Sequence, residues 1–522
     1  MNEKKITTIN LIALVLAVVL IIVTVFSVIN VQKNNSTGEA LSYQQFSDKY
    51  TYKNTKKTSE GGIANIGDPH VFWDEASGKW YMTGTSGGTH VKIWSSEDLT
   101  TWDEGKIIIE NKDISWAFYD PASGAYGLWG AEIHKVGDQY QLYFSTWGKD
   151  ESGNASTSPR IGVAVCDTVD GIYQATDKPL FDFGYSAIDN HLFTDEDGKR
   201  YMVYCRDATD NVVNNRRESH IYIVELNADG LSVKEGSEPT CLITPEYSWE
   251  TATPDPKWVW TEGCWMQKMN GKYYLFYSAS KFSTWDYCIG YAVSDSPMGP
   301  FVKNPEPLMQ TFANELSGPG NNSFFTSKDG KELFTAYHMH TTPANPSGNR
   351  YLNIDRIGLR EDGTVYVNAP TFTDQPLPSG EKDGHTLLSD EAKIVADTAE
   401  GYKASAINDG EVAVVDKYKD NEWCAAKPVA EAVLRLEWDK AVEINSIFIY
   451  NSIIAEHATV TVDIKLSNGV VLESIKLGEF GGEAGIVNLN GVKSSWIEIS
   501  VADKSAEQTA FALSEVMVFG TK

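Results

Sequence analysis

Three acidic residues, Asp68, Asp189 and Glu262, stand at corresponding places in a repeated pattern of the chain. Each is followed by an apolar strand, a turn and an aromatic strand, and Trp129 and Asn321 take the same place in two further copies. Acidic groups that converge cannot all ionise at low cost, so their pKa values separate. One can then activate water while another donates a proton to a leaving oxygen. The pattern predicts acid–base hydrolysis.

The elements that position these residues are strand–turn–strand units. In the clearest copy, over residues 260–278, Asn270 and Gly271 separate two apolar and aromatic runs, which is a strong hairpin signal. The five aligned positions are separated by 61, 60, 73 and 59 residues. Five units of this length predict an all-β, five-bladed β-propeller over residues 63–373, with its innermost strands converging on one axis.

The remaining segments differ from the repeat. Residues 1–31 carry two lysines and then an apolar run long enough to cross a bilayer, so we expect a membrane anchor, with a cleaved signal peptide as the alternative. Residues 32–62 are polar and predict a stalk, and residues 374–390 predict a linker. Short β-runs over residues 391–522 predict a separate β-sandwich of jelly-roll type.

The composition excludes some functions. The net charge of −27 argues against nucleic-acid binding. Six cysteines occur without a Cys-x-x-Cys pair, which argues against a zinc knot. We expect mainly buried thiols, and one disulfide stays open for an exported protein. No protein partner is inferred from the sequence.

Several motifs over residues 63–373 resemble those of glycoside hydrolase family 43. They are Gly67-Asp68-Pro69-His70, Trp94-Ser-Ser-Glu-Asp-Leu-Thr-Thr-Trp102, Ile188-Asp189, Thr261-Glu262-Gly263, Gly318-Pro319-Gly320 and Tyr337-His338. The chain departs from the family pattern at Asn190 and Cys264, where proline is usual, and at Asn321, where histidine is common.

The resemblance implies inverting hydrolysis of terminal or side-chain pentosyl linkages in a polysaccharide or oligosaccharide. Asp68 would be the general base, Glu262 the general acid, and Asp189 would orient the acid and tune its pKa. Inversion places a water between base and sugar, so we expect the Asp68 and Glu262 carboxyl groups roughly 6.5–9.5 Å apart. His338 would face the channel and hold a cation or water. The chemistry itself requires no cofactor.

Sugar contacts are expected from aromatic and polar residues near these acids. Trp129 is expected to form a wall of the pocket, because the other inner positions are polar. Trp94 and Trp265 are predicted as further contacts, with packing inside a blade as the alternative, and Asn321 completes the set.

The C-terminal region resembles discoidin-like (factor 5/8 type C) carbohydrate-binding modules. The matching segments are residues 404–410 with Trp423, 434–438, 447–451 and 513–516. The resemblance implies a structural Ca²⁺ bound by Asp409 and Glu515, in keeping with the oxygen ligands that this ion prefers. The module would either bind glycan or only pack against the propeller.

Together these features predict an exported, membrane-anchored glycosidase on the extracellular face. An α-L-arabinofuranosidase is the favoured activity, and a β-xylosidase is the nearest alternative. A non-catalytic sugar-binding propeller is the alternative from another class, and the presence of all three acids argues against it.

Overall fold

The computed structural model describes residues 50–54, 66–120, 126–312, 316–416 and 419–522. In these ranges regular structure is almost entirely β-strand, with a few short 3-10 turns. None of the helical segments in the described ranges has the length and hydrophobicity that a bilayer crossing requires. The anchor expected over residues 1–31 lies outside the described residues.

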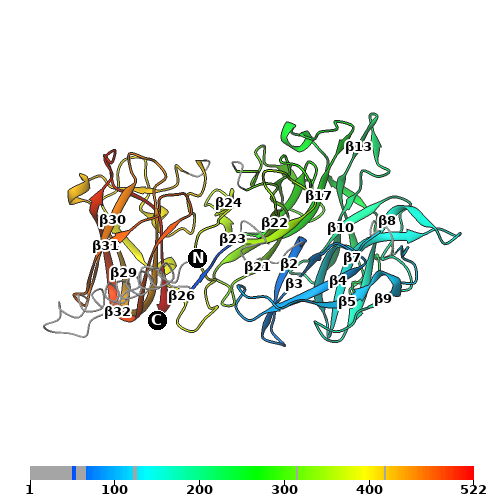
Figure 1. Cartoon of the computed structure of the whole chain (residues 1–522), viewed down its shortest axis with the longest axis horizontal. Coiled ribbons are helices and arrows are strands. Elements are labelled where there is room, and N and C mark those ends of the chain that lie inside the picture. Colours follow the sequence, from blue (N-terminus) through cyan, green and yellow to red (C-terminus); the bar gives the residue numbers. More distant parts are fainter. Residues whose placement is uncertain (1–49, 55–65, 121–125, 313–315, 417–418) are drawn as a thin grey trace, which may run out of the picture.

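Five antiparallel sheets of four strands each make the five predicted blades (Figure 1). Blades 1 and 2 contain β2 (Gly67–Asp74), β3 (Lys79–Thr85), β4 (His90–Ser96), β5 (Lys106–Glu110), β6 (Trp129–Val136), β7 (Gln139–Lys149), β8 (Ala155–Cys166) and β9 (Gln174–Ala175). Blade 3 contains β10 (Ala187–Thr194), β11 (Arg200–Arg206), β14 (His220–Leu226) and β15 (Thr240–Ile243). Blades 4 and 5 contain β17 (Thr261–Met269), β18 (Lys272–Ala279), β19 (Cys288–Ser294), β20 (Val302–Lys303), β21 (Gly320–Thr326), β22 (Leu333–His340), β23 (Arg350–Leu359) and β24 (Val365–Val367).

The hairpin between β17 and β18 shows why the sequence folds in this way. Asn270 and Gly271 both have positive φ, at 49° and 76°, and Met269 pairs with Lys272 across the turn. Two residues in this conformation match the right-handed twist of the flanking strands. The turn fixes the register, so that Phe276 and Leu275 are fully buried. A small extra sheet combines β12 (Val212–Val213) and β13 (Arg216–Glu218), from the connection between β11 and β14 of blade 3, with β16 (Trp258–Val259), from the connection between blades 3 and 4.

The stalk and the linker are more ordered than the sequence suggests. β1 (Thr51–Tyr52) pairs with β25 (Gln375–Pro376), and Asn54 Nδ2 donates a hydrogen bond to Ile354 O at 2.9 Å. The stalk expected over residues 32–62 therefore does not include residues 50–54, which pack on blade 5. The linker expected over residues 374–390 also packs against the propeller. Within it, Glu381 accepts a 2.9 Å hydrogen bond from Trp80 Nε1 of blade 1.

The C-terminal module is a separate sheet structure with its own core. Its strands are β26 (Thr386–Leu387), β27 (Lys393–Ala396), β28 (Trp423–Cys424), β29 (Val433–Asn451), β30 (Thr459–Leu466), β31 (Val471–Lys476), β32 (Ala484–Lys504) and β33 (Ala512–Thr521). β29 and β32 pair along most of their length, with register shifts that let these long strands bend around the core. Trp423 and Phe511 are fully buried inside it.

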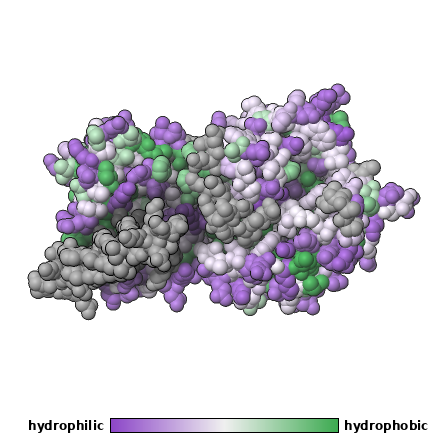
Figure 2. Space-filling view, in the orientation of Figure 1, coloured by the Kyte–Doolittle hydropathy of each residue, from purple (hydrophilic) through white to green (hydrophobic). Residues whose placement is uncertain are grey.

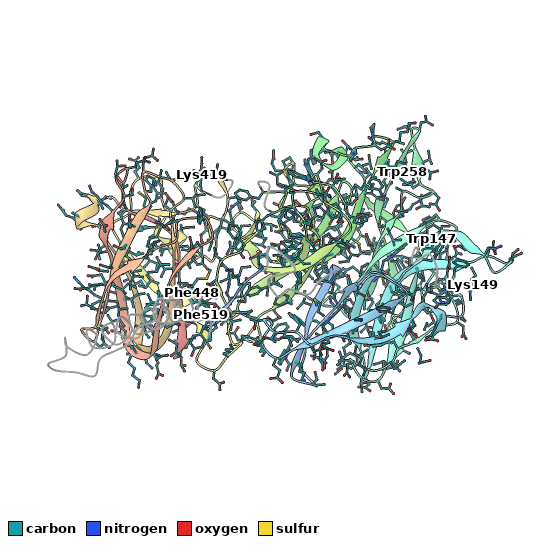
Figure 3. The ribbon with its side chains drawn as sticks, in the orientation of Figure 1. Trp147, Lys149, Trp258, Lys419, Phe448 and Phe519 are labelled. Atoms are coloured by element: carbon teal, nitrogen blue, oxygen red, sulfur yellow. The ribbon has the colours of Figure 1, made fainter. Side chains whose placement is uncertain are left out.

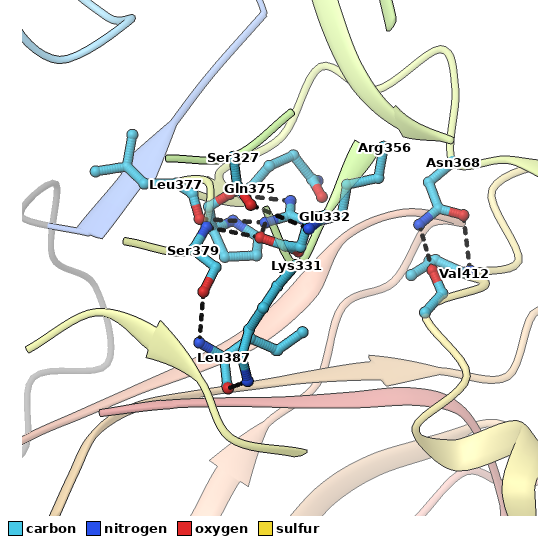
Figure 4. Close-up of polar contacts among 12 residues, drawn as sticks. Ser327, Lys331, Glu332, Arg356, Asn368, Gln375, Leu377, Ser379, Leu387 and Val412 are labelled. Atoms are coloured by element: carbon cyan, nitrogen blue, oxygen red, sulfur yellow. Dashed lines mark hydrogen bonds and ion pairs between the residues drawn. The ribbon is translucent and has the colours of Figure 1, made fainter. Parts of the chain in front are cut away.

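The module is docked on blade 5 through polar contacts (Figure 4). The side chain of Asn368 donates to Gly410 O at 2.8 Å and accepts from Val412 N at 2.9 Å. Lys331 Nζ donates to Leu387 O at 2.6 Å. In these bonds, propeller side chains satisfy backbone groups of the module and of the segment leading into it, so the module has a defined position on the propeller.

The surface and the cysteines agree with the composition. Hydrophilic residues cover most of the face shown in Figure 2, as the charge of −27 leads one to expect. All six cysteines are free thiols. Four of them are buried, whereas Cys241 is exposed and Cys166 is half-buried. The structure therefore supports the expectation of free thiols, and it contains no disulfide among these six cysteines.

Candidate active site

Each innermost strand begins with a bulge that contains a residue of positive φ. The register shifts occur at the same place in β2, β6, β10, β17 and β21. The residues in the left-handed region are Asp68, Gly130, Asp189, Gly263 and Asn321, with φ between 45° (Asn321) and 58° (Gly263). This region is unfavourable for most side chains, and Asp, Asn and Gly tolerate it best. Strain of this kind is typical of functional sites.

The bulges correct the repeat register that the sequence suggested. Glu262 and Trp129 are each the residue directly before the left-handed position, whereas Asp68, Asp189 and Asn321 occupy it. The expected equivalence of Glu262 with Asp68 and Asp189 is therefore wrong by one residue. Because neighbouring strand residues point in different directions, Glu262 approaches the axis differently from the two aspartates.

The backbone N–H groups of these bulges explain where Asp189 points. In three blades, the left-handed residue donates to a hydroxyl of the preceding blade; the acceptors are Thr85, Ser145 and Ser278, at 2.9, 3.0 and 2.7 Å. In blade 4 the acceptor is instead Asp189 Oδ2, which receives a 2.8 Å bond from Gly263 N. The Asp189 carboxylate is thereby held next to Glu262, the residue before Gly263.

The starts of the innermost strands surround one cavity of about 390 Å³. All three acidic residues line it, although they are far apart in the sequence. The other lining residues are Thr85, Trp129, Trp147, Pro159, Ile188, Asp207, Thr209, Trp260, Lys281, Phe282, Tyr287, Asn321 and Arg350. A cavity with aromatic walls and converging acids is suited to a single sugar residue.

Asp68 is held by two residues of blade 5. Arg350 Nη1 donates to Asp68 Oδ1 at 2.8 Å, and Asp68 N donates to His338 Nδ1 at 3.1 Å. Gly67 makes the first contact possible, since a Cβ at this position would lie 2.1 Å from Arg350 Cζ. The charged pair fixes the carboxylate in one orientation at the cavity.

Glu262 has the surroundings of a proton donor. Its side chain is buried, and Tyr287 Oη donates a 3.1 Å hydrogen bond to Glu262 Oε1. Burial, followed by the negative charges of Asp189 and Asp207, raises the pKa of Glu262 well above its usual value. Burial, followed by the charge of Asp68, also raises the pKa of Asp189. Glu262 can therefore keep a proton at neutral pH beside the charge of Asp189.

The atoms of His338 fit a water better than a cation. Its Nδ1 accepts the bond from Asp68 N, and burial, together with the nearby Arg350 charge, lowers its pKa well below the usual value. A neutral ring of this tautomer carries its proton on Nε2. That nitrogen is buried without a partner among the described residues. An N–H group calls for an acceptor and cannot bind a cation, so the cation expectation is corrected.

Two of the four expected sugar contacts lie elsewhere. Trp94 is 6% exposed and packs in the core between blades 1 and 5, and Trp265 is 7% exposed and contacts Phe324 and His191. Neither side chain lines the sugar cavity, so the prediction that Trp94 and Trp265 contact the sugar is wrong, and both pack inside the propeller. Trp129 and Asn321 do line it.

Several cavity residues were not identified from the sequence. Arg350 and Tyr287 contact the two expected catalytic carboxylates, and Asp207 contributes charge beside Glu262. Both Arg350 and Tyr287 lie outside the innermost strands, so the repeat carries no signal for them. Further walls come from Trp147, Trp260 and Phe282. Figure 3 places Trp147 on the part of the propeller remote from the C-terminal module.

The structure brings together the two expected calcium ligands of the C-terminal module. Asp409 and Glu515 line a second cavity of about 270 Å³ between the module and blade 5. Glu515 accepts bonds from Gly410 N and Val516 N at 2.7 and 3.0 Å. Burial, followed by the charge of Asp409, raises the pKa of Glu515 well above its usual value. Glu515 is buried whereas Asp409 is exposed, and a pair of carboxylates that destabilise each other's charge fits a divalent cation.

A five-bladed propeller with three carboxylates around one sugar-sized cavity, one of them held by Arg350 and another buried with a raised pKa, defines a glycoside-cleaving enzyme. Comparisons with known proteins agree with this class. Residues 64–365 match glycosyl hydrolases family 43, and the chain belongs to this family. Residues 388–519 match a domain of unknown function, DUF7402.

Individual relatives support the same assignment. A thermostable family-43 glycoside hydrolase of known structure is 35% identical, with a TM-score of 0.56, and the match covers 63% of this chain and 100% of that one. The beta-D-galactofuranosidase xynD of Aspergillus niger is 30% identical over 295 residues, which is 55% of this chain and 76% of that protein. The alpha-L-arabinofuranosidase B of Pyricularia oryzae is 24% identical, over 51% of this chain and 54% of its own length.

Proposed function

We propose that this glycoside hydrolase is an inverting, exo-acting enzyme that releases terminal or side-chain pentosyl residues, with α-L-arabinofuranosidase as the favoured activity. The observation that carries the proposal is the contrast between two carboxylates at one cavity. Asp68 is paired with the Arg350 guanidinium, whereas Glu262 is buried, bonded to Tyr287 and of raised pKa. This contrast supplies one base and one acid.

In the proposed reaction, Asp68 takes a proton from a water as the water oxygen bonds to the anomeric carbon. The bond from that carbon to the leaving oxygen breaks at the same time, and Glu262 gives its proton to this oxygen. Asp189 is a positioning residue, because its carboxylate accepts from Gly263 N and its charge favours the protonated form of Glu262. Such an in-line displacement inverts the anomeric configuration.

The walls of the cavity limit what can enter. Trp129, Trp147 and Trp260 supply apolar faces on which a sugar ring can stack, and Asn321 and Thr209 supply polar atoms. A volume of about 390 Å³ suits one terminal residue. We therefore propose cleavage from chain ends or side branches.

Hydrolysis of chromogenic glycosides tests the activity. The purified protein should release p-nitrophenol from the α-L-arabinofuranoside in preference to the β-D-xyloside. Asp68→Asn should lose roughly 10²–10⁴-fold in kcat/KM, the range of a positioned acid or base. Equal rates for the variant and the native protein would remove Asp68 from the mechanism, and an inert native protein that still binds sugars would favour the non-catalytic alternative.

A second candidate, β-D-galactofuranosidase, is supported by the Aspergillus niger relative. The two substrates share the same ring configuration and differ in the chain attached to the furanose, so one set of acids can serve both. The β-D-galactofuranoside therefore belongs in the same assay. A higher kcat/KM on it than on the arabinofuranoside would make it the preferred substrate, whereas preference for the xyloside would favour β-xylosidase.

For the C-terminal module, we propose a discoidin-like carbohydrate-binding role, with Ca²⁺ held by Asp409 and Glu515. These two carboxylates lie where the module meets blade 5, which supports an ion at this place. The ion would stabilise the contact between the module and blade 5 without taking part in hydrolysis. Pull-down on insoluble arabinan or arabinoxylan tests the binding. Retention equal to that of a protein lacking any such module would oppose it.

We also propose export, with residues 1–31 as a membrane anchor and secretion after cleavage as the alternative. The apolar run and the two preceding lysines support this. Fractionation of expressing cells tests it: full-length protein in the membrane fraction, accessible to external protease, is expected. A shortened protein in the medium would favour cleavage.

A further inference from the structure

A third cavity lies at the end of the central channel opposite the sugar pocket. The sugar pocket is lined by the first residues of the innermost strands, such as Trp129 and Asp189. Residues further along the same strands, such as His134 and Phe193, line a separate cavity of about 480 Å³. Because the strands run along the axis, the two cavities lie at its two ends.

Three side chains with metal-binding atoms converge beside this third cavity: His134 and His191 line it, and Glu132 lies next to them. Glu132 and His134 come from β6 in blade 2, and His191 comes from β10 in blade 3. Glu132 Oε2 is 2.8 Å from His134 Nε2 and 3.2 Å from His191 Nδ1. All three ligand atoms lie within 4.8 Å of one another, and within the described ranges no other such group of three was found.

The hydrogen bonds around His191 leave a place for a cation. His191 Nε2 is 3.3 Å from Met266 O, and a carbonyl oxygen can only accept a hydrogen bond. With the ring proton on Nε2, the Nδ1 lone pair points at an oxygen of the Glu132 carboxylate. Two lone pairs in contact require a positive charge between them, either an added proton or a metal ion. A backbone carbonyl on the far nitrogen is the usual support of a metal-binding histidine.

The neighbouring His70 does not compete for this place. Its Nδ1 accepts a 3.2 Å hydrogen bond from Ile133 N, and its ring stacks on His134 with centroids 5.1 Å apart. This stacking holds the His134 ring in its orientation toward Glu132. The carboxylate and the two imidazoles thus keep one arrangement.

We propose that Glu132, His134 and His191 bind one divalent transition-metal ion of the Zn²⁺ class. Imidazole and carboxylate ligands suit Zn²⁺, and ligand atoms about 2 Å from one ion lie about 3 Å from each other, as Glu132 Oε2 does from each of the two histidine nitrogens. The His134 and Glu132 side chains are 19% and 12% exposed, so water from the cavity can complete the coordination. The ion joins blade 2 to blade 3 inside the channel, where Glu132 also lines a small cavity together with Asp68 and Asp189, and its role is structural.

Cobalt binding to the purified full-length protein, without a histidine tag and treated with chelator, tests the site. Co²⁺ reports nitrogen coordination through its visible absorption, independently of sugar hydrolysis. We expect saturation at one equivalent, displacement by Zn²⁺, and a rise of several degrees in Tm with either ion. Ca²⁺ should not compete, because it prefers oxygen ligands.

His134→Ala should lose the cobalt absorption and the Tm rise while keeping kcat/KM. The matched control is His457→Ala, because His457 pairs with the single carboxylate of Glu422 at 2.6 Å in the C-terminal module. If His134→Ala fails to fold, Glu132→Gln keeps the side-chain shape and should show the same loss. No cobalt absorption in the native protein, or an unchanged signal in the variants, would overturn the proposal in favour of a protonated His191 paired with Glu132.

Discussion

Replacement of Tyr287 by phenylalanine should shift the pH dependence of hydrolysis in a definite direction. The Tyr287 hydroxyl donates to Glu262 Oε1 at 3.1 Å, and this bond favours the charged carboxylate and lowers the Glu262 pKa. A hydrogen bond to a charged group contributes about 1.5–3 kcal/mol, and one pKa unit corresponds to about 1.4 kcal/mol. Because 3.1 Å is long for such a bond, the low end applies. The Glu262 pKa should therefore rise by about one.

The alkaline limb of kcat/KM reports loss of the proton from the catalytic acid in the free enzyme. A higher pKa keeps Glu262 protonated to higher pH, so this limb should move upward by about one pH unit in Tyr287→Phe. Tyr277→Phe is the matched control, because Tyr277 is a buried tyrosine of the same blade that donates to Glu250 at 2.8 Å. An unmoved or lowered limb in Tyr287→Phe, or an equal shift in the control, would refute the assignment of Glu262 as the acid.

Three further changes test other contacts. Gly67→Ala should push the Arg350 guanidinium away from the Asp68 carboxylate. The variant should lose about tenfold or more in kcat/KM with little change in Tm. Native activity in the variant would show that the ion pair is dispensable. Asp189→Asn removes a charge that raises the Glu262 pKa, so the alkaline limb should move to lower pH; a move upward would exclude this coupling. Glu515→Gln should abolish a Ca²⁺-dependent rise in Tm, and an undiminished rise in the variant would place the ion elsewhere.

Much of the fold was predictable because each repeat contains local sequence signals for its strands and turns. Asn270 and Gly271 favour positive φ, which determines the hairpin whatever surrounds it. The strand patterns recur in all five blades, and five sheets of four strands are present. That Asp68 and Asp189 reach one cavity follows from this symmetry alone.

Other features depend on contacts that no local pattern encodes. The hairpins that follow the innermost strands differ in length, with two residues between Met269 and Lys272 and four between Asp74 and Lys79, so alignment on the second strand does not carry the register of Glu262 over to the first. Arg350 reaches Asp68 from blade 5 across 282 positions of sequence. Trp94, Trp265 and Trp129 are the same residue type, so the sequence does not distinguish them. Only the direction in which each side chain points decides whether it packs in the core or lines the cavity.

In the proposed mechanism Asp68 and Glu262 act on opposite sides of the anomeric carbon, Asp68 through a water and Glu262 directly on the leaving oxygen. Proton NMR of the sugar released in the first minutes of hydrolysis, before mutarotation, measures this most directly. The first product should have the inverted anomeric configuration. A first product with the configuration of the substrate would contradict it.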